Sequence, residues 1–405
     1  MDKRVYWVHL QKCVGENVVL EGFMEKYGSA EAFYNMGPEE WKSCNIPGIA
    51  RKACTLLQSE DMAKSEEIVS FCDKHSIHII TPEDERYPKN LLKIKNFPCV
   101  LYVRGDADCL NSGHSLAVIG SRTPCVYGEN AAKKIVKGLA EKKITVVSGG
   151  ALGVDSIAHK TAMENGTKTI LVLGHGHGYR YLPENSQMRK SVTMNGAVIS
   201  EYPPYTPVHQ GTFPQRNRII SGMSDGVVII EAAQRSGTFS TARHALKQGR
   251  ALYVLPGDID SGNFEGSNQL ITEGAKAVFS YADILEDFGI HTDREKILTK
   301  NNTPFVKIKE PSKEGKGQKP KEKKKSEAKK EKIQPKIENN VKFDVQGVSK
   351  NAQIVYNIMS DGISELDDIT RKSALEIRKV LTALVELEMS GAVCMTAPNK
   401  YEIKS

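Results

Sequence analysis

Two kinds of pattern alternate over residues 66–290. Helical stretches such as ENAAKKIVKGLAEK and DSIAHKTAMENG lie between many of the short apolar runs rich in Val and Ile, which are SLAVIG (115–120), ITVVS (144–148), TILVLG (169–174), GAVIS (196–200), GVVIIEAA (226–233) and ALYVLPG (251–257). Near-continuous apolar strands that alternate with helices are typical of a parallel sheet buried on both faces. The pattern therefore predicts an α/β domain with a Rossmann-like, doubly wound and mostly parallel sheet.

Residues 1–65 follow a helical period instead. Apolar positions recur at helical spacing in VVLEGFMEKYG and in ARKACTLLQ. The turn Asn45–Ile49 between them resembles half of a helix-hairpin-helix, in which backbone N–H groups hold a phosphate. A structural helix–helix turn explains the same residues, and we favour it. This segment is predicted to be a small helical domain of the helix-hairpin-helix or SAM-like type.

Residues 345–405 predict a winged-helix-like domain. Helical spacing marks NAQIVYNIMS, ELDDITRKS and ALEIRKVLTALVELEMSG, and the last stretch has Ser373 as its expected N-cap and Gly391 at its end. AVCMT and KYEI flank the turn residues Pro398 and Asn399 as a hairpin. Three helices followed by a hairpin is the order of a winged helix.

Two functions are open for this C-terminal domain. The third helix of such modules can bind duplex DNA, and here it carries Arg378 and Lys379. The same helix also carries Glu376, Glu386 and Glu388, which repel phosphates. We therefore favour a protein-interaction or dimerisation module over duplex binding.

The net charge of +7 belongs to one segment of the chain. Residues 307–342 hold 14 Lys and 6 Glu, which leaves 42 basic and 43 acidic residues elsewhere. A segment so poor in apolar residues cannot offset the entropy of ordering, so residues 291–344 are predicted to be a disordered, Lys-rich linker. The linker serves either as a plain tether or as a tether that also attracts polyanions, and the pattern of charges does not distinguish these two functions.

The remaining composition indicates a cytoplasmic protein. The eight cysteines are scattered without a CxxC pair, which is the usage of a reducing compartment. No apolar run reaches the length of a membrane span, and the N-terminus lacks the features of a secretory signal. We expect no contact with a membrane.

Candidate binding residues follow the first strand. Gly120, Ser121 and Arg122 precede a helix expected from about Tyr127. Glycine permits close backbone approach, a helix start presents free N–H groups, and the arginine adds a fork of donors. This combination predicts an anion site, although neither GxGxxG nor GxxxxGK[ST] occurs.

A second glycine-rich loop follows the next strand. Ser148, Gly149 and Gly150 predict a backbone cradle, and Asp155 is expected to be the N-cap of the helix that follows. His159 on that helix is equally well explained as a buried residue or as a pocket donor.

The densest signal is the segment FPQRNRII. Arg216 and Arg218 flank Asn217, close to Phe213. Arginine pairs with phosphates, an amide can meet a base edge and an aromatic ring can stack on a base. One of the two arginines is expected to form a structural salt bridge instead.

Neither a metal site nor catalytic machinery is predicted. His175 and His177 lie on a Gly-rich loop with no nearby carboxylate, which makes a poor metal site. No activated nucleophile or pair of acid–base carboxylates is apparent, and we expect no cofactor. The enzyme alternative is a nucleotide phosphoribohydrolase of a related Rossmann-like fold with a PGGxGTxxE motif. In the corresponding stretch, RSGTFST, Thr241 stands where that motif has its glutamate.

The ordered motifs resemble those of the DNA-processing protein A family (DprA, also called Smf). GSRTPCVYG, SGGALGVDSIAH, FPQRNRII, EAAQRSGTFSTA, LPG and GSNQLITEGA stand in that family's order and, with FPCVLYVRGD, cover about residues 66–288. The resemblance implies a non-enzymatic, dimeric protein that binds and protects single-stranded DNA and helps load RecA recombinase during natural transformation. Carried over by motif, the DNA pocket would comprise Gly120, Ser121, Arg122, Ser148, Gly149, Gly150, Lys160, Phe213, Arg216, Asn217, Arg218, Ser236, Gly237 and Thr238.

Two departures from the family pattern concern the first loop and a later one. Cys125 stands where Ser or Thr is commoner, so we expect weaker hydrogen bonds in the first loop. The stretch HGHGYRYLP stands where the family more usually has a Gly-rich loop with an acidic residue before Tyr-Pro. This departure leaves the geometry of that loop undetermined, but it does not affect the main pocket.

Overall fold

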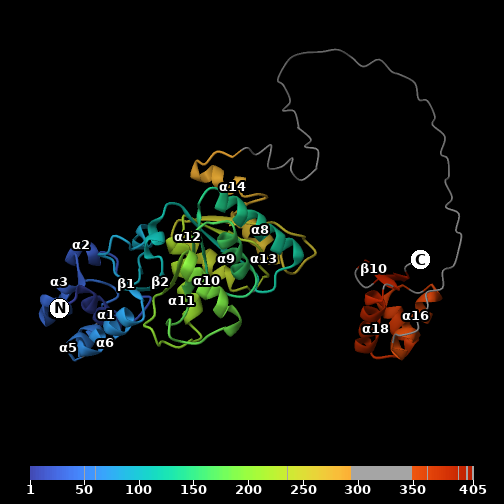
Figure 1. Cartoon of the computed structure of the whole chain (residues 1–405), viewed down its shortest axis with the longest axis horizontal. Coiled ribbons are helices and arrows are strands. Elements are labelled where there is room, and N and C mark those ends of the chain that lie inside the picture. The colour runs from blue at the N-terminus through green and yellow to red at the C-terminus, as the bar shows by residue number, and fades with distance from the viewer. Residues whose placement is uncertain are drawn as a thin grey trace, which may run out of the picture. The chain divides into compact units, whose positions relative to one another are not determined.

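The computed structural model forms two compact units, Met1–Lys309 and Glu310–Ser405 (Figure 1). It describes residues 1–292 and 349–403, apart from 50, 60, 235, 363, 391, 398 and 399. The predicted linker therefore lies, from residue 293 to its end, outside the described residues. Within the described part of the chain, no helix combines the length and the apolar character needed to cross a membrane.

A nine-stranded sheet organises the larger unit. Its strand order is β1-β2-β6-β5-β4-β3-β7-β8-β9, with β3 to β9 parallel and with β1 and β2 added antiparallel at one edge. The strands are β1 (His78–Ile80), β2 (Leu101–Gly105), β3 (Ser115–Ile119), β4 (Thr145–Ser148), β5 (Thr169–Leu173), β6 (Ala197–Ser200), β7 (Gly226–Ile229), β8 (Ala251–Val254) and β9 (Lys276–Ala277). The six predicted strands and the mostly parallel α/β sheet are confirmed.

Both faces of the sheet are covered because successive strand residues alternate between two apolar clusters. Ala117 and Ile119 of β3 belong to the cluster that contains α11 and α12, whereas Leu116 and Val118 belong to the one that contains α8, α9 and α14. The helices of this domain are α7 (Lys89–Leu92), α8 (Val126–Glu141), α9 (Val154–Glu164), α10 (Ser186–Asn195), α11 (Thr212–Met223), α12 (Thr238–Lys247), α13 (Glu265–Thr272) and α14 (Ala282–Leu285).

Six helices precede the sheet and gather at one end of the larger unit (Figure 1). They are α1 (Lys3–Val14), α2 (Phe23–Tyr27), α3 (Ala30–Asn35), α4 (Pro38–Ser43), α5 (Arg51–Ser59) and α6 (Ala63–Lys74). Their core is continuous with that of the α11 face of the sheet. The turn before α5 has a structural role, because the Gly48 N–H donates to the Val19 carbonyl at 2.7 Å and is not free for a phosphate.

The smaller unit has a separate core and the order of a winged helix. It consists of α16 (Lys350–Ser360), α17 (Leu366–Ser373), α18 (Ile377–Met389), β10 (Val393–Ala397) and β11 (Lys400–Ile403). The predicted N-cap at Ser373 is wrong. Ser373 ends α17, the next residue is left-handed with a φ of 52°, and α18 begins only at Ile377. Gly391, Pro398 and Asn399 lie outside the described residues.

Candidate nucleic-acid interface

A cavity of about 100 Å³ lies at the carboxyl ends of β3, β4 and β5 and beside the first turns of α11. We call it the strand-end pocket. Ligands of open α/β sheets bind at this edge. Its lining residues are Arg122, Gly149, Gly150, Ala151, Leu152, Leu173, Gly174, His175, Tyr181, Leu182, Arg189, Phe213 and Arg216. The structure thus brings together five of the predicted residues from three separate loops or helices.

Arg216 forms the buried wall of the pocket. Its Nη1 atom donates to the carbonyl of Gly149 at 2.7 Å and also to that of Val172, while its Nε atom is buried without a partner among the described residues. A Cβ at Gly149 would lie 2.6 Å from Nη1, so the absence of a side chain there lets the guanidinium approach the loop. Burial lowers the pKa of Arg216.

Arg122 brings a second positive charge to the same pocket. Its side chain is exposed, and in the described part of the chain its guanidinium has no hydrogen-bond or ion-pair partner. Burial is the largest effect that lowers the pKa of Arg216, and Asp155 opposes it. The charge of Arg122 lowers this pKa further. Two guanidinium groups that repel one another leave a local excess of positive charge, which a phosphate between them would neutralise.

Aromatic rings line the other side of the pocket. Phe213 lies 5.3 Å from Tyr181 between ring centroids, and Tyr181 lies 5.5 Å from His175. The Arg216 guanidinium is 5.8 Å from the centre of the Phe213 ring. Burial lowers the pKa of His175 and so favours its neutral ring. The pocket therefore combines cations with apolar ring surface.

The second glycine-rich loop is held by the chain itself. Asp155 was expected to be the N-cap of α9, but that helix begins at Val154 after Gly153. The Asp155 carboxylate instead reaches back and accepts the N–H groups of Gly149 and Ala151, each at 3.2 Å. Because these donors are occupied, the loop offers less of a backbone cradle than its glycines predicted.

The first loop differs from its prediction in a similar way. At the N-terminus of α8, the Cys125 N–H is not free for an external anion, because Glu231 Oε2 accepts it at 3.0 Å. Cys125 is the N-cap, and its sulfur accepts the Gly128 N–H at 3.4 Å. Ser121 uses its Oγ to accept the Thr123 N–H and its carbonyl to accept the Val154 N–H. Of this loop, only Arg122 lines the strand-end pocket.

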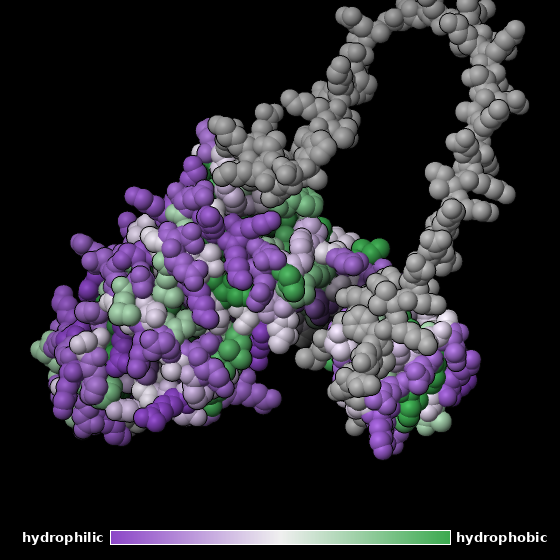
Figure 2. Space-filling view, turned by 45° about the vertical axis from the view of Figure 1, so that its right-hand side comes forward, coloured by the Kyte–Doolittle hydropathy of each residue, from purple (hydrophilic) through white to green (hydrophobic). Residues whose placement is uncertain are grey.

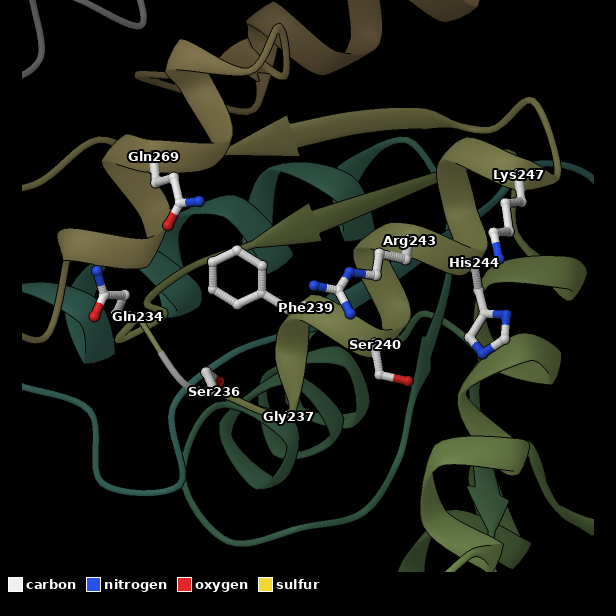
Figure 3. Close-up of a pocket in the computed structure, with 9 residues that line it drawn as sticks. All are labelled: Gln234, Ser236, Gly237, Phe239, Ser240, Arg243, His244, Lys247 and Gln269. Atoms are coloured by element: carbon white, nitrogen blue, oxygen red, sulfur yellow. The ribbon is translucent and has the colours of Figure 1, made fainter.

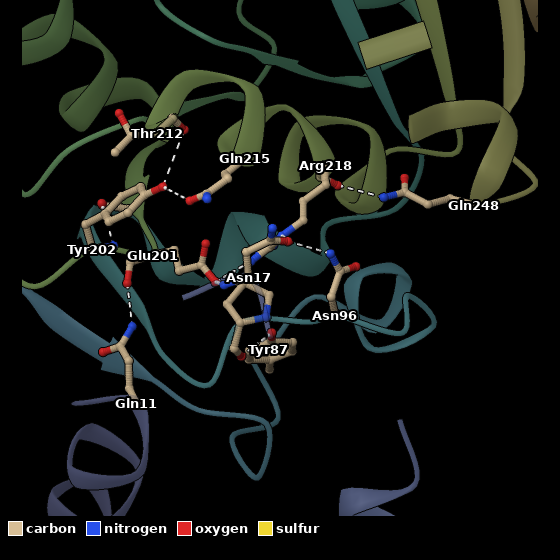
Figure 4. Close-up of polar contacts among 12 residues, drawn as sticks. Gln11, Asn17, Tyr87, Asn96, Glu201, Tyr202, Thr212, Gln215, Arg218 and Gln248 are labelled. Atoms are coloured by element: carbon tan, nitrogen blue, oxygen red, sulfur yellow. Dashed lines mark hydrogen bonds and ion pairs between the residues drawn. The ribbon is translucent and has the colours of Figure 1, made fainter. Parts of the chain in front are cut away.

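Arg218 lies on the opposite side of α11 and does not reach the pocket. It is fully buried in an ion pair with Glu201, and its Nε donates to Asn17 Oδ1 at 2.7 Å (Figure 4). Gln11 completes the network by donating to the Glu201 carbonyl at 2.6 Å. The expected structural arginine of the FPQRNRII segment is therefore Arg218, and the structure offers no surface at which this side chain could meet DNA.

Other predicted residues fall outside the strand-end pocket. Ser148 is buried and donates to the Val118 carbonyl at 2.7 Å. His159 is a buried helix residue whose Nδ1 lies 2.7 Å from Thr169 Oγ1, and burial lowers its pKa to about 3. Lys160 is exposed on α9, and neither Lys160 nor Asn217 lines the pocket.

The third predicted loop opens into a different cavity, of about 650 Å³, which we call the α12 groove (Figure 3). Gly237 and Ser236 lie at its start, whereas Thr238 is buried and its Oγ1 lies 2.7 Å from Ser236 Oγ. Arg243, His244 and Lys247 continue the groove along α12 (Figure 3). Five of the predicted residues thus line the strand-end pocket, two line the α12 groove, and the others line neither cavity.

Several pocket residues escaped the sequence prediction. His175, Tyr181 and Leu182 come from the HGHGYRYLP stretch, which was set aside because it departs from the family pattern. Arg189 on α10 donates to the Tyr181 carbonyl at 2.7 Å and so fixes that stretch against the pocket. The only available signal was the density of aromatic and basic residues in it.

The two histidines of the same stretch, which were predicted to make a poor metal site, lie close to backbone carbonyls. His177 Nε2 lies 2.8 Å from the Tyr102 carbonyl, and His175 Nδ1 lies 2.9 Å from the Gly176 carbonyl. Among the described residues, no group of three or more His, Cys, Asp or Glu side chains could hold a metal ion.

Comparison with known proteins gives two family matches. The family model described as DNA recombination-mediator protein A matches residues 78–289, and the model described as DprA winged helix domain matches residues 344–397. Together they cover the sheet domain and most of the smaller unit.

Individual relatives agree. The chain is 39% identical over 229 residues to Protein Smf of Escherichia coli (strain K12), covering 56% of this chain and 61% of that protein. It is 38% identical over 245 residues to DNA processing protein DprA of Streptococcus pneumoniae, covering 60% and 83%. An X-ray structure of DNA processing protein A from Streptococcus pneumoniae is similar with a TM-score of 0.60 at 30% identity, covering 70% of this chain and 97% of that one. The chain spans less than two thirds of the Escherichia coli relative.

Proposed function

The chain belongs to the DNA recombination-mediator protein A family, and from this premise we propose that it binds single-stranded DNA in the strand-end pocket. The observation that carries the proposal is the convergence of Arg122 and Arg216 with the rings of Phe213 and Tyr181. Positive charge and stacking surface together are the means by which proteins hold single strands without reading their sequence.

The size of the pocket supports a polymeric ligand. At about 100 Å³, it is smaller than the roughly 300–1,000 Å³ of a site that encloses a whole small molecule. It accommodates one group of a longer chain, such as a phosphate or the edge of a base. We infer that the protein acts by binding rather than by catalysis, and Thr241, which replaces the glutamate of the phosphoribohydrolase motif, is itself buried.

The test is a titration of the full chain with fluorescent oligonucleotides. We expect tighter binding to a single strand than to a duplex of the same sequence, with a clear dependence on salt. Equal affinity for both, or release of free base from nucleoside monophosphates, would overturn the proposal. Measuring both readouts on the same preparation separates a binding protein from the enzyme alternative.

We further propose, from the family resemblance, that the protein is a homodimer in the cytoplasm that helps load RecA recombinase on the bound strand. All eight cysteines are free, which suits a reducing compartment. The recombinase's DNA-dependent ATPase on strands coated with a single-strand-binding protein should rise when the chain is added. No rise, or a monomeric mass by light scattering, would count against the respective part.

For the winged-helix domain we propose a protein contact rather than duplex binding. On α18, Ile377, Leu381 and Val385 are 49%, 39% and 55% exposed and follow one another at helical spacing. Hydrophobic side chains are visible on the surface of this unit (Figure 2). Leu381→Glu should leave duplex affinity unchanged, and a fall in that affinity would favour the duplex-binding alternative.

A further inference from the structure

The N-terminus of α8 occupies the place at which doubly wound folds bind a phosphate. It follows β3 at the carboxyl edge of the parallel sheet, and α8 is 16 residues long. A helix end of this kind presents N–H groups and a partial positive charge.

A carboxylate of the chain itself lies there. Glu231 follows β7, which pairs with β3 through Ile229 and Ile119. Its Oε2 atom accepts the Cys125 N–H at 3.0 Å, and the residue has no exposed surface. The Oε1 atom is buried and has no hydrogen-bond partner among the described residues.

The backbone around this carboxylate leaves room for it. A Cβ at Gly128 would lie 2.5 Å from Oε2, closer than a side chain could tolerate. A Cβ at Gly120 would lie 3.2 Å from the Glu231 nitrogen. Gly128 thus leaves room for the Glu231 carboxylate, whereas Gly120, the glycine that the sequence pattern assigned to phosphate approach, leaves room for the Val154 side chain and the Glu231 backbone.

Among the described residues, no positive side chain compensates the carboxylate. In the described part of the chain, Glu231 forms no ion pair with Lys, Arg or His. A buried carboxylate without a counterion is destabilising unless other groups favour its charge. The α8 N-terminus is the group in contact with it, and a helix end favours a negative charge.

We propose that Glu231 is a built-in substitute for a ligand phosphate and determines specificity by excluding small oxyanions and mononucleotides from the α8 N-terminus. Its carboxylate fills the space and uses a donor, and its charge repels a second anion. The Rossmann-like domain is thereby closed to the ligands that such a helix end ordinarily takes. This inference concerns free anions and holds whether or not the strand-end pocket binds DNA.

The test uses the full chain, inorganic phosphate and Glu231→Ala. Removing the carboxylate should lower Tm in chloride buffer, and phosphate at constant ionic strength should restore part of the loss by binding in its place. We expect the wild type to show no such stabilisation and the variant to bind phosphate about tenfold more tightly. Amide resonances of Cys125 and Gly128 should shift with phosphate in the variant alone. Equal phosphate binding by both proteins, or none by the folded variant, would overturn the proposal.

Two further variants keep the inference testable if Glu231→Ala does not fold. Glu231→Gln retains the size but not the charge, so it should be less stable than the wild type and should not be rescued by phosphate, because the amide still fills the site. Stability equal to that of the wild type would overturn the proposal. Glu273→Ala, which removes an exposed carboxylate at the end of α13, is the matched control and should gain no phosphate binding. Single-strand affinity of the wild type, measured in parallel, reports separately on the proposed function.

Discussion

The two sides of α11 carry arginines two residues apart that have opposite environments. Arg216 faces the strand-end pocket, where its nearest charged neighbours include the like charge of Arg122. Arg218 faces the N-terminal helices, where Glu201 neutralises it and Asn17 accepts a further hydrogen bond. Two residues along a helix correspond to a rotation of about 200°. A motif that reads as one arginine-rich patch is therefore divided by the helical period into a side that faces the strand-end pocket and a structural side.

The largest effect should come from the structural side. Arg218→Ala leaves the Glu201 carboxylate buried without its partner, which should lower the free energy of unfolding by about 3–5 kcal/mol. Urea unfolding followed by circular dichroism measures the change. The control is the double variant Arg218→Met with Glu201→Leu, which should recover most of the loss because no charge is then left unpaired. A single variant that unfolds at the wild-type midpoint would contradict the structural role.

The second test measures how the contribution of the buried His159 to the free energy of unfolding depends on pH. Burial and the Arg216 charge lower the pKa of His159 to about 3, against about 6.5 for histidine in an unfolded chain. The unfolded state therefore binds the proton more readily. The stability contributed by neutral His159 is complete above about pH 6.5 and is lost as the pH falls toward 3. The loss amounts to about 3 kcal/mol at pH 4.

His159→Asn should remove this dependence, because its amide keeps a group near Thr169 but does not titrate in this range. Parallel unfolding curves between pH 7 and pH 4 compare the two proteins. Identical slopes of stability against pH would exclude His159 as the source.

The binding side should respond in affinity rather than in stability. Arg122→Ala should weaken single-strand binding and make the plot of log K against log salt shallower by about 0.7, the share of one phosphate contact. Fluorescence anisotropy at several salt concentrations gives both quantities. Lys137→Ala, which removes an exposed cation from the middle of α8, is the matched control and should change neither. An unchanged slope in Arg122→Ala would count against the strand-end pocket.

The smallest expected effect is in the loop that carries Arg122. Cys125→Ser should raise the free energy of unfolding by about 0.5–1 kcal/mol, because a hydroxyl is a better N-cap acceptor than a thiol. Differential scanning calorimetry should show a higher Tm. A lower Tm would mean that the sulfur is required for packing rather than for capping α8.

Six strands were predictable because their short apolar runs, rich in Val and Ile, are buried on both faces of the sheet and alternate with helical stretches. The runs at 115–120 and 226–233 predicted β3 and β7 within a few residues. β1 and β2 were not predicted as strands, although residues 99–103, which include most of β2, also form a buried apolar run. Their antiparallel pairing at the sheet edge depends on tertiary contacts.

The residues that line the strand-end pocket were predictable only in part, since five of the predicted site residues lie there. Pro214 argues against a helix in this segment, because proline breaks a helix interior. Here it lies in the first turn of α11, where proline is tolerated. Without that helix, the opposite directions of Arg216 and Arg218 could not be derived. The occupation of the loop donors by Asp155 and Glu231 was also hidden, because it depends on where each helix begins and on a contact between segments 106 residues apart.

The network of Gln11, Asn17, Glu201 and Arg218 joins the N-terminal helices to the helix that lines the pocket (Figure 4). Such contacts make separate segments open and close together as one cooperative unit. In hydrogen exchange, the amides of α11 and those of α1 should therefore share a common opening free energy. An N-terminal region that resembles a removable accessory is in this sense part of the sheet domain, and deleting it would release α11 as well.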